Sequence, residues 1–224
     1  MDRSNLVGLF IGFMIASGVL MAFILAPLAQ DQPLPIIKRA PSFTLINQDN
    51  QTVALENFEN KVILVGFMYT ACQDVFCPLM TTHFKLLQND LFPKLGTEFR
   101  MLSITLDPLY DTPERLKNYG SDYGANFSVW QFLTAYTQAE INKVVDDYDV
   151  ISYANDFSDL FNTSSSNSTT GFKMYLQHEN ETHPAELVHS WVSVLIDRTL
   201  MIRRIYSSVS WIYSVAKDDI LGLI

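Results

Sequence analysis

The apolar positions of this chain form one long run near the N-terminus and several short runs further on. Residues 6–28 (LVGLFIGFMIASGVLMAFILAPL) contain no charged side chain and no Asn or Gln. As a helix rising about 1.5 Å per residue, this run reaches roughly 35 Å, enough to cross a hydrocarbon core of about 30 Å. A cleaved signal peptide would have a shorter apolar stretch and a small-x-small exit, which the sequence LAPLAQ at 25–30 lacks. We therefore predict a retained transmembrane anchor at 6–28, preceded by a cytoplasmic stub at 1–5.

The side of the membrane is predicted from residues downstream of the anchor. Five Asn-x-Ser/Thr acceptor triplets begin at Asn50, Asn126, Asn162, Asn167 and Asn180. All five lie in the part of the chain where a glycosylation machinery would meet them if this part is exported. Flanking charge decides little, because Arg3 on one side is matched by Lys38 and Arg39 on the other. We expect a single-pass protein of the cell membrane with its globular domain on the extracytoplasmic side.

Short apolar runs beyond the anchor indicate a globular α/β domain. Residues 29–40 carry two prolines and mixed polarity, which predicts a linker, and the domain then occupies 41–224. The unbroken apolar run VILVGFM at 62–68 predicts a central strand covered on both faces. Apolar residues at helical spacing predict a helix over 78–95, with a proline that suits its first turn. A second strand is expected at 99–106.

The second half of the domain completes the predicted fold. Thr and Pro open a helix over 112–123, and a further helix is expected at 138–148. Strand, helix, strand, helix in this order implies a right-handed parallel unit. Strands at 191–196 and 201–206 are close enough to form a hairpin, and a last amphipathic helix covers 210–223. The order predicts a thioredoxin-like α/β sandwich with a central mixed sheet.

One segment inside the domain does not fit this pattern. The sequence NDFSDLFNTSSSNSTTG at about 155–171 is rich in Ser, Thr and Asn. It cannot bury enough apolar surface to order itself. We predict a polar insertion there.

Composition narrows the function. The 15 Lys and Arg residues face 24 Asp and Glu residues, a net charge of −9 that argues against phosphate-backbone binding. We therefore expect no nucleic-acid partner. Hydrophobic residues at 48% and charged residues at 17% exclude general disorder, and two cysteines exclude a disulfide-dense scaffold.

Both cysteines lie in one loop, YTACQDVFCP at 69–78, between the predicted central strand and the next helix. Backbone N–H groups and the helix dipole stabilise a thiolate at such a place. A structural disulfide is the alternative, but a bridge that closes so few residues adds little loop-closure stability. If the pair binds a metal, two soft thiolates select Cu(I), and a histidine imidazole beside them would add a ligand that also binds Cu(II). The sequence therefore favours a reactive or metal-binding pair at Cys72 and Cys77.

The cysteine loop resembles the Y-T-x-C-P-D-x-C-P loop of the Sco/SenC copper chaperones, which are thioredoxin-fold proteins anchored by one N-terminal span. Three further pieces agree in order. They are PSFTL at 41–45 with FENKV at 58–62, LDPLYDTPERLK at 106–117, and VHS at 188–190 ahead of VLID at 194–197. The cysteine loop departs from the family in two ways: four residues separate its cysteines, where the family has three, and Gln73 stands where the family has proline.

The resemblance implies a copper site formed by Cys72, Cys77 and His189, in which the two cysteines are also a redox dithiol. It further implies a metallochaperone that helps to assemble the copper A centre of a haem-copper cytochrome oxidase, with the copper-accepting subunit of that oxidase as its partner. A thiol-disulfide oxidoreductase is the alternative function, and a peroxide- or redox-sensing module is the third. We do not expect a conventional enzyme.

The other polar residues near these motifs have weaker claims. We expect His83, His178 and His183 at the surface rather than among the metal ligands. Asp74 and Asp107 could orient the cysteine loop or assist a partner, and surface or capping roles are equally compatible with their positions.

Overall fold

A computed structural model describes residues 33–72, 76–150, 192–207 and 213–224. Within these ranges no helix has the length and apolar character needed to cross a bilayer. The predicted anchor at 6–28 and the polar insertion at 155–171 lie outside them.

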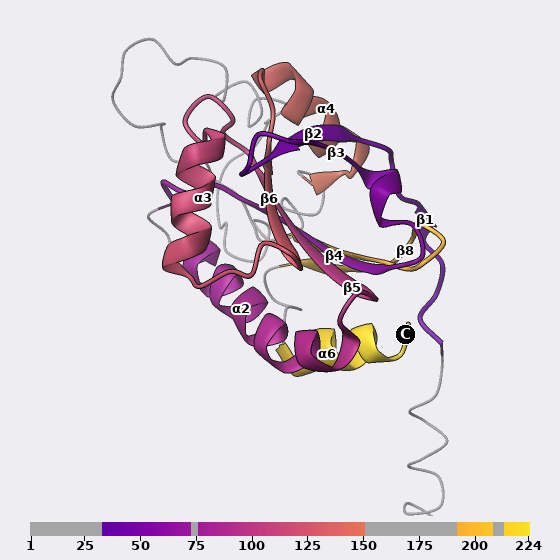
Figure 1. Cartoon of the computed structure of the whole chain (residues 1–224). Helices are drawn as coiled ribbons and strands as arrows, with labels where there is room; N and C mark the ends of the chain where they lie inside the picture. Colours follow the sequence, from indigo (N-terminus) through magenta and orange to yellow (C-terminus); the bar gives the residue numbers. More distant parts are fainter. Residues whose placement is uncertain (1–32, 73–75, 151–191, 208–212) are drawn as a thin grey trace, which may run out of the picture. The chain divides into compact units, whose positions relative to one another are not determined.

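Eight strands of the described residues form one mixed sheet in the order β1-β8-β7-β4-β5-β6-β2-β3 (Figure 1). They are β1 (Lys38–Arg39), β2 (Thr44–Asn47), β3 (Thr52–Ala54), β4 (Val62–Met68), β5 (Phe99–Thr105), β6 (Trp130–Thr134), β7 (Val192–Ile196) and β8 (Met201–Ser207). The central strands β4, β5 and β6 are parallel, and every other pairing is antiparallel. The mixed sheet and the β7–β8 hairpin are confirmed. The sequence did not indicate β2, β3 or β6, and β1 lies inside the predicted linker.

Helices cover both faces of the sheet. On one face are α2 (Phe76–Leu95), α3 (Pro113–Asp122) and α6 (Tyr213–Leu221); on the other are α4 (Gln138–Asp147) and the short 3-10 helix η2 (Leu55–Phe58) (Figure 1). Two helix starts follow from local sequence. Thr112 caps α3 by accepting from the Arg115 backbone N–H at 3.3 Å, as predicted. Thr137 and Glu140 cap each other's backbone at the start of α4.

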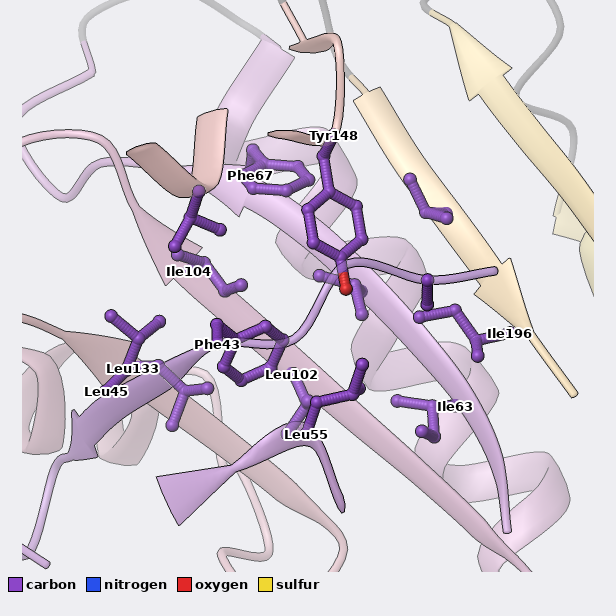
Figure 2. Close-up of a cluster of buried hydrophobic side chains, with 14 of the residues drawn as sticks. Phe43, Leu45, Leu55, Ile63, Phe67, Leu102, Ile104, Leu133, Tyr148 and Ile196 are labelled. Atoms are coloured by element: carbon purple, nitrogen blue, oxygen red, sulfur yellow. The ribbon is translucent and has the colours of Figure 1, made fainter. Parts of the chain in front are cut away.

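The central strand β4 is buried along its whole length, and its side chains serve two separate cores. Ile63, Val65 and Phe67 join the cluster beneath α4 and η2, in which the rings of Phe67 and Tyr148 lie 5.9 Å apart (Figure 2). Gly66 points to the opposite face, where a Cβ atom would lie 2.8 Å from the Phe84 ring of α2. Burial on both faces explains why this strand is an unbroken apolar run.

Gly120 sets how closely α3 approaches β6. A Cβ atom there would lie 2.7 Å from a ring carbon of Phe132 and 2.8 Å from one of Phe127. Phe132 also packs against Trp130, with ring centroids 4.8 Å apart, so its ring has little room to retreat. The helix lies against the sheet because no side chain intervenes at this position.

We expect Gly120→Ala to lower the free energy of unfolding by about 1–3 kcal/mol, because overpacking against the fully buried Phe132 ring outweighs the roughly 1 kcal/mol that alanine gains in helix propensity. Urea denaturation followed by tryptophan fluorescence measures the change. Gly222→Ala is the matched control, since its Cβ would meet nothing nearer than the Asp218 carbonyl oxygen at 3.5 Å. Equal stability of Gly120→Ala and the parent protein would contradict the close approach.

Candidate metal centre

The site lies at the edge of the sheet where the parallel strands β4 and β5 end. The Leu106 N–H donates to the Met68 carbonyl at 2.8 Å, so the two strands leave the sheet side by side. Residues that follow adjacent parallel strands at this edge are the usual source of binding groups in α/β folds. The cysteine loop begins here, directly after β4.

The two cysteines differ in position and exposure. Cys72 is half-buried, and its N–H donates to the Tyr69 carbonyl at 3.4 Å in the turn that follows β4. Cys77 is 2% exposed and lies in the first turn of α2, because this helix begins at Phe76 rather than at the predicted residue 78. The N-terminal end of a helix dipole favours a thiolate at Cys77.

A buried carboxylate fixes the chain just before Cys72. Asp111 is fully buried, and its Oδ2 accepts from the Thr70 N–H at 3.0 Å and from the Thr105 hydroxyl at 2.5 Å. Its Oδ1 accepts from the Thr70 hydroxyl. The carboxylate thus joins the end of β5 to the residue that stands two positions ahead of Cys72. This role of Asp111 was not predicted, although Asp111 is the second Asp of the motif at 106–117.

Burial raises the pKa of Asp111, and the hydrogen bonds from Thr105 and Thr70 oppose that effect. The charge of Asp107 raises this pKa further. Asp107 itself is 3% exposed; its Oδ1 accepts from the Tyr110 N–H at 3.3 Å, and its carbonyl accepts from the Asp111 N–H at 2.8 Å. Asp107 therefore shapes the turn that presents Asp111, whereas Asp74 lies outside the described residues.

Only one of the four histidines lies within the described residues. His83 is half-buried between α2 and α6, with its ring 6.4 Å from that of Tyr213, and burial lowers its pKa. The prediction of a surface position for His83 was wrong, because α6 covers this part of α2. His178, His183 and His189 lie outside the described residues. In the part of the chain that the structure describes, no three His, Cys, Asp or Glu side chains are grouped as a metal site would require.

An open, polar hollow of about 550 Å³ borders the cysteine loop at Thr70. It lies between Tyr110 and the exposed side of α3, where the Arg115 guanidinium stacks 3.8 Å from the centre of the Tyr110 ring. Glu114 and Asp122 add acidic groups to its wall. Tyr119 of α3 also lines the hollow.

A mixed α/β sheet with one cysteine just after its central strand and a second in the first turn of the following helix is the arrangement of a thioredoxin-like fold that carries two cysteines at one sheet edge. The SCO1/SenC family model matches residues 35–167, which is more than half of the chain. The chain belongs to the SCO1/SenC family, as the motifs predicted.

Individual relatives agree with this assignment. The SCO1 protein homologue of Bacillus subtilis is 34% identical over 129 residues, which cover 58% of this chain and 66% of that protein. The chain thus spans just under two thirds of this relative's length, and less than half of two further curated relatives.

Solved structures show the same fold. BsSco, a member of the Sco family of cytochrome c oxidase assembly proteins, superposes with a TM-score of 0.61 at 24% identity, over 87% of this chain and 98% of that one. ScoI of Arabidopsis thaliana with copper bound gives a TM-score of 0.60 at 20% identity, over 81% of this chain and 95% of that one. The predicted thioredoxin-like sandwich is therefore confirmed.

Proposed function

We propose that this protein is a membrane-anchored, extracytoplasmic copper metallochaperone that assists assembly of the copper A centre of a haem-copper cytochrome oxidase. The observation that carries the proposal is the placement of both cysteines of the chain at one sheet edge, one before and one inside the first turn of α2. Family membership and a copper-bound structural relative support copper as the cargo. The apolar run at 6–28 supplies the anchor.

We assign the metal ligands to Cys72, Cys77 and His189. Two thiolates suit Cu(I), and the imidazole lets the site retain Cu(II) as well. The sheet register supports His189 as the third ligand. In the antiparallel pairing of β7 with β4, Ser193 lies opposite Gly66, so the chain enters β7 at the edge where β4 ends. His189 is three positions before Val192, a length of chain that reaches at most about 11 Å from the start of β7.

Metal binding and disulfide formation exclude each other at this site, because the same two sulfur atoms serve both. Cys72 and Cys77 must lose their protons to bind copper, and a disulfide removes the thiolates. The site therefore holds copper only while the dithiol is reduced. The partner is the copper-accepting subunit of the oxidase, which reaches the cysteine loop by way of the polar hollow beside Thr70.

Transfer to a client tests the proposal. The full-length protein in detergent, reduced and loaded with copper, is expected to metallate an oxidase copper-domain apoprotein whose cysteines are already reduced. His189→Ala should abolish this transfer, because it removes a metal ligand while it leaves the dithiol intact. The visible absorption of the client's copper centre measures the result.

His83→Gln is the control, since it removes a histidine that packs against α6 and is not assigned to the site. It should support transfer at the parental rate. If His189→Ala metallated the client fully and only the cysteine variants failed to do so, the chaperone function would be wrong and thiol-disulfide exchange would be the function instead. An oxidoreductase would also reduce the client's disulfide at an unchanged rate without His189.

A further inference from the structure

The first turn of α2 is tied to α3 through two side-chain hydroxyl groups. The Thr81 hydroxyl donates to the Cys77 carbonyl oxygen at 2.8 Å. The same Thr81 oxygen lies 2.9 Å from the Tyr119 hydroxyl. A threonine hydroxyl has a single hydrogen, and here that hydrogen is directed at the Cys77 carbonyl, so Tyr119 must be the donor to Thr81. Two hydrogen bonds in series therefore connect Tyr119 to the backbone of Cys77.

Tyr119 is suited to act as a permanent donor. Burial raises the pKa of its phenol and outweighs the opposing effect of the hydrogen bond with Thr81, so the hydroxyl keeps its proton at neutral pH. The ring is held by its neighbours. It lies 4.9 Å from the ring of Tyr123 and meets the ring of Phe132 on β6 edge-on, with centroids 6.1 Å apart. The donor is thus fixed to the sheet rather than carried on a mobile side chain.

Burial on the α2 side makes the loss of either hydrogen bond in this connection costly. Thr81 is 2% exposed, as is Cys77, whereas Tyr119 is half-buried and lines the polar hollow, so water has little access on the α2 side of the connection. Gly120, next to Tyr119, lets α3 lie close enough to the sheet for the phenol to reach α2. Loss of the phenol hydroxyl would leave the Thr81 oxygen without its donor and free the first turn of α2 to shift.

We propose that Tyr119 is a positioning residue for the metal centre, which holds the Cys77 thiol in place through Thr81. Asp111 fixes Thr70 ahead of Cys72, and Tyr119 acts on the other side of the cysteine loop. The segment 107–122 therefore anchors the chain on both sides of this loop. The four residues between the cysteines, one more than the family spacing, then connect two fixed points.

Tyr119→Phe tests the proposal because it removes only the hydroxyl. In the full-length protein in detergent, we expect Cys77 to react with iodoacetamide several-fold faster relative to Cys72, as measured by mass spectrometry of each cysteine. The affinity for Cu(I), measured by competition with a chromophoric chelator, should fall about two- to tenfold, the loss of one net hydrogen bond. The copper measurement rests on the proposed function; the alkylation ratio does not.

Three further single variants and one double variant, Tyr119→Phe with Thr81→Val, isolate the positioning role. Tyr213→Phe is the matched control, because its hydroxyl also bonds to α2, at Asp90, but far from the cysteines. It should leave the alkylation ratio and the Cu(I) affinity at parental values. Thr81→Ser keeps a hydroxyl and should behave as the parent. Thr81→Val should reproduce Tyr119→Phe, and the double variant should be no worse than Thr81→Val alone.

The possible results separate the inferences. If Tyr119→Phe matches Tyr213→Phe in both measurements, or if both cysteines of Tyr119→Phe react faster by the same factor, Tyr119 does not position Cys77. If the parent protein binds no Cu(I), the proposed copper function fails. The alkylation ratio then decides the positioning role by itself.

Discussion

Replacement of Cys72 or Cys77 by serine is expected to abolish tight Cu(I) binding, with affinity reduced by roughly a hundredfold or more. The reason is chemical. A serine hydroxyl keeps its proton at neutral pH and is a hard oxygen donor, whereas Cu(I) prefers soft thiolate sulfur. Structural zinc sites, for comparison, bind their metal with about 10–16 kcal/mol in total, so one ligand of such a site is worth a few kcal/mol, and about 1.4 kcal/mol is a factor of ten in affinity. Competition titration of the reduced full-length protein measures the loss.

His189→Ala should behave differently from the cysteine variants. Because thiolates contribute most to Cu(I), loss of His189 is expected to weaken Cu(II) retention more than Cu(I) affinity. His83→Gln serves as the control and should leave both at parental values. If His189→Ala changed neither affinity, His178 or His183 would be the third ligand. Unchanged Cu(I) affinity in both cysteine variants would refute the site altogether.

Asp111→Ala is expected to lower the free energy of unfolding by about 2–4 kcal/mol. The variant removes the acceptor of three hydrogen bonds from Thr70 and Thr105 at a fully buried position. Each buried donor left without an acceptor costs about 1–3 kcal/mol, reduced where a hydroxyl can turn to another partner. Urea denaturation at pH 7 measures the change. Asp111→Asn is the matched variant, because it keeps one acceptor oxygen and the side-chain shape, and it should lose much less.

The pH dependence of stability, compared between the parent protein and Asp111→Asn, gives a second check. Burial raises the folded-state pKa of Asp111 above its unfolded value near 3.9. The folded state therefore binds more protons between these two pKa values, and the contribution of Asp111 to stability is lost as pH rises through the folded pKa. Asp107, which carries the nearby negative charge, is common to both proteins. The stability of Asp111→Asn relative to the parent should thus improve from pH 4 to pH 7, and the opposite trend would contradict a raised pKa.

Local patterns were sufficient to predict the central strand β4, the helix α3 and the β7–β8 hairpin. The strand predicted at 62–68 has the same first and last residues as β4. Helix α3 begins directly after its N-cap Thr112, as the sequence indicated. The hairpin at 192–207 also agrees with the expectation from its two short apolar runs. These features depend on residues close together in the chain. Burial on two faces, helix capping and short connections each select residue types within a few positions, so a local sequence pattern predicts them.

The strands β2, β3 and β6 were missed for the opposite reason. β2 and β3 have four and three residues, too few for a period to show. β6 has five, and its sequence WQFLT does not alternate. Each is a strand because it pairs with another part of the chain: β6 with β5, and β2 with both β6 and β3. Such pairing depends on backbone hydrogen bonds to a distant partner, which a single sequence does not display.

By itself, the sequence determined that two cysteines follow a buried strand near the start of a helix, and its motifs pointed to the SCO1/SenC family that the comparison confirmed. Only the tertiary structure decided what holds these cysteines. Asp111 meets Thr70 across 41 positions of chain, and Tyr119 meets Thr81 across 38. Nothing near Thr70 or Thr81 in the sequence identifies either partner, because the contacts arise when β4 and β5 end together and Gly120 lets α3 approach the sheet. Folding moves these groups from water into the protein interior. A hydrogen bond left unmade there is costly, and the choice of partner therefore becomes specific.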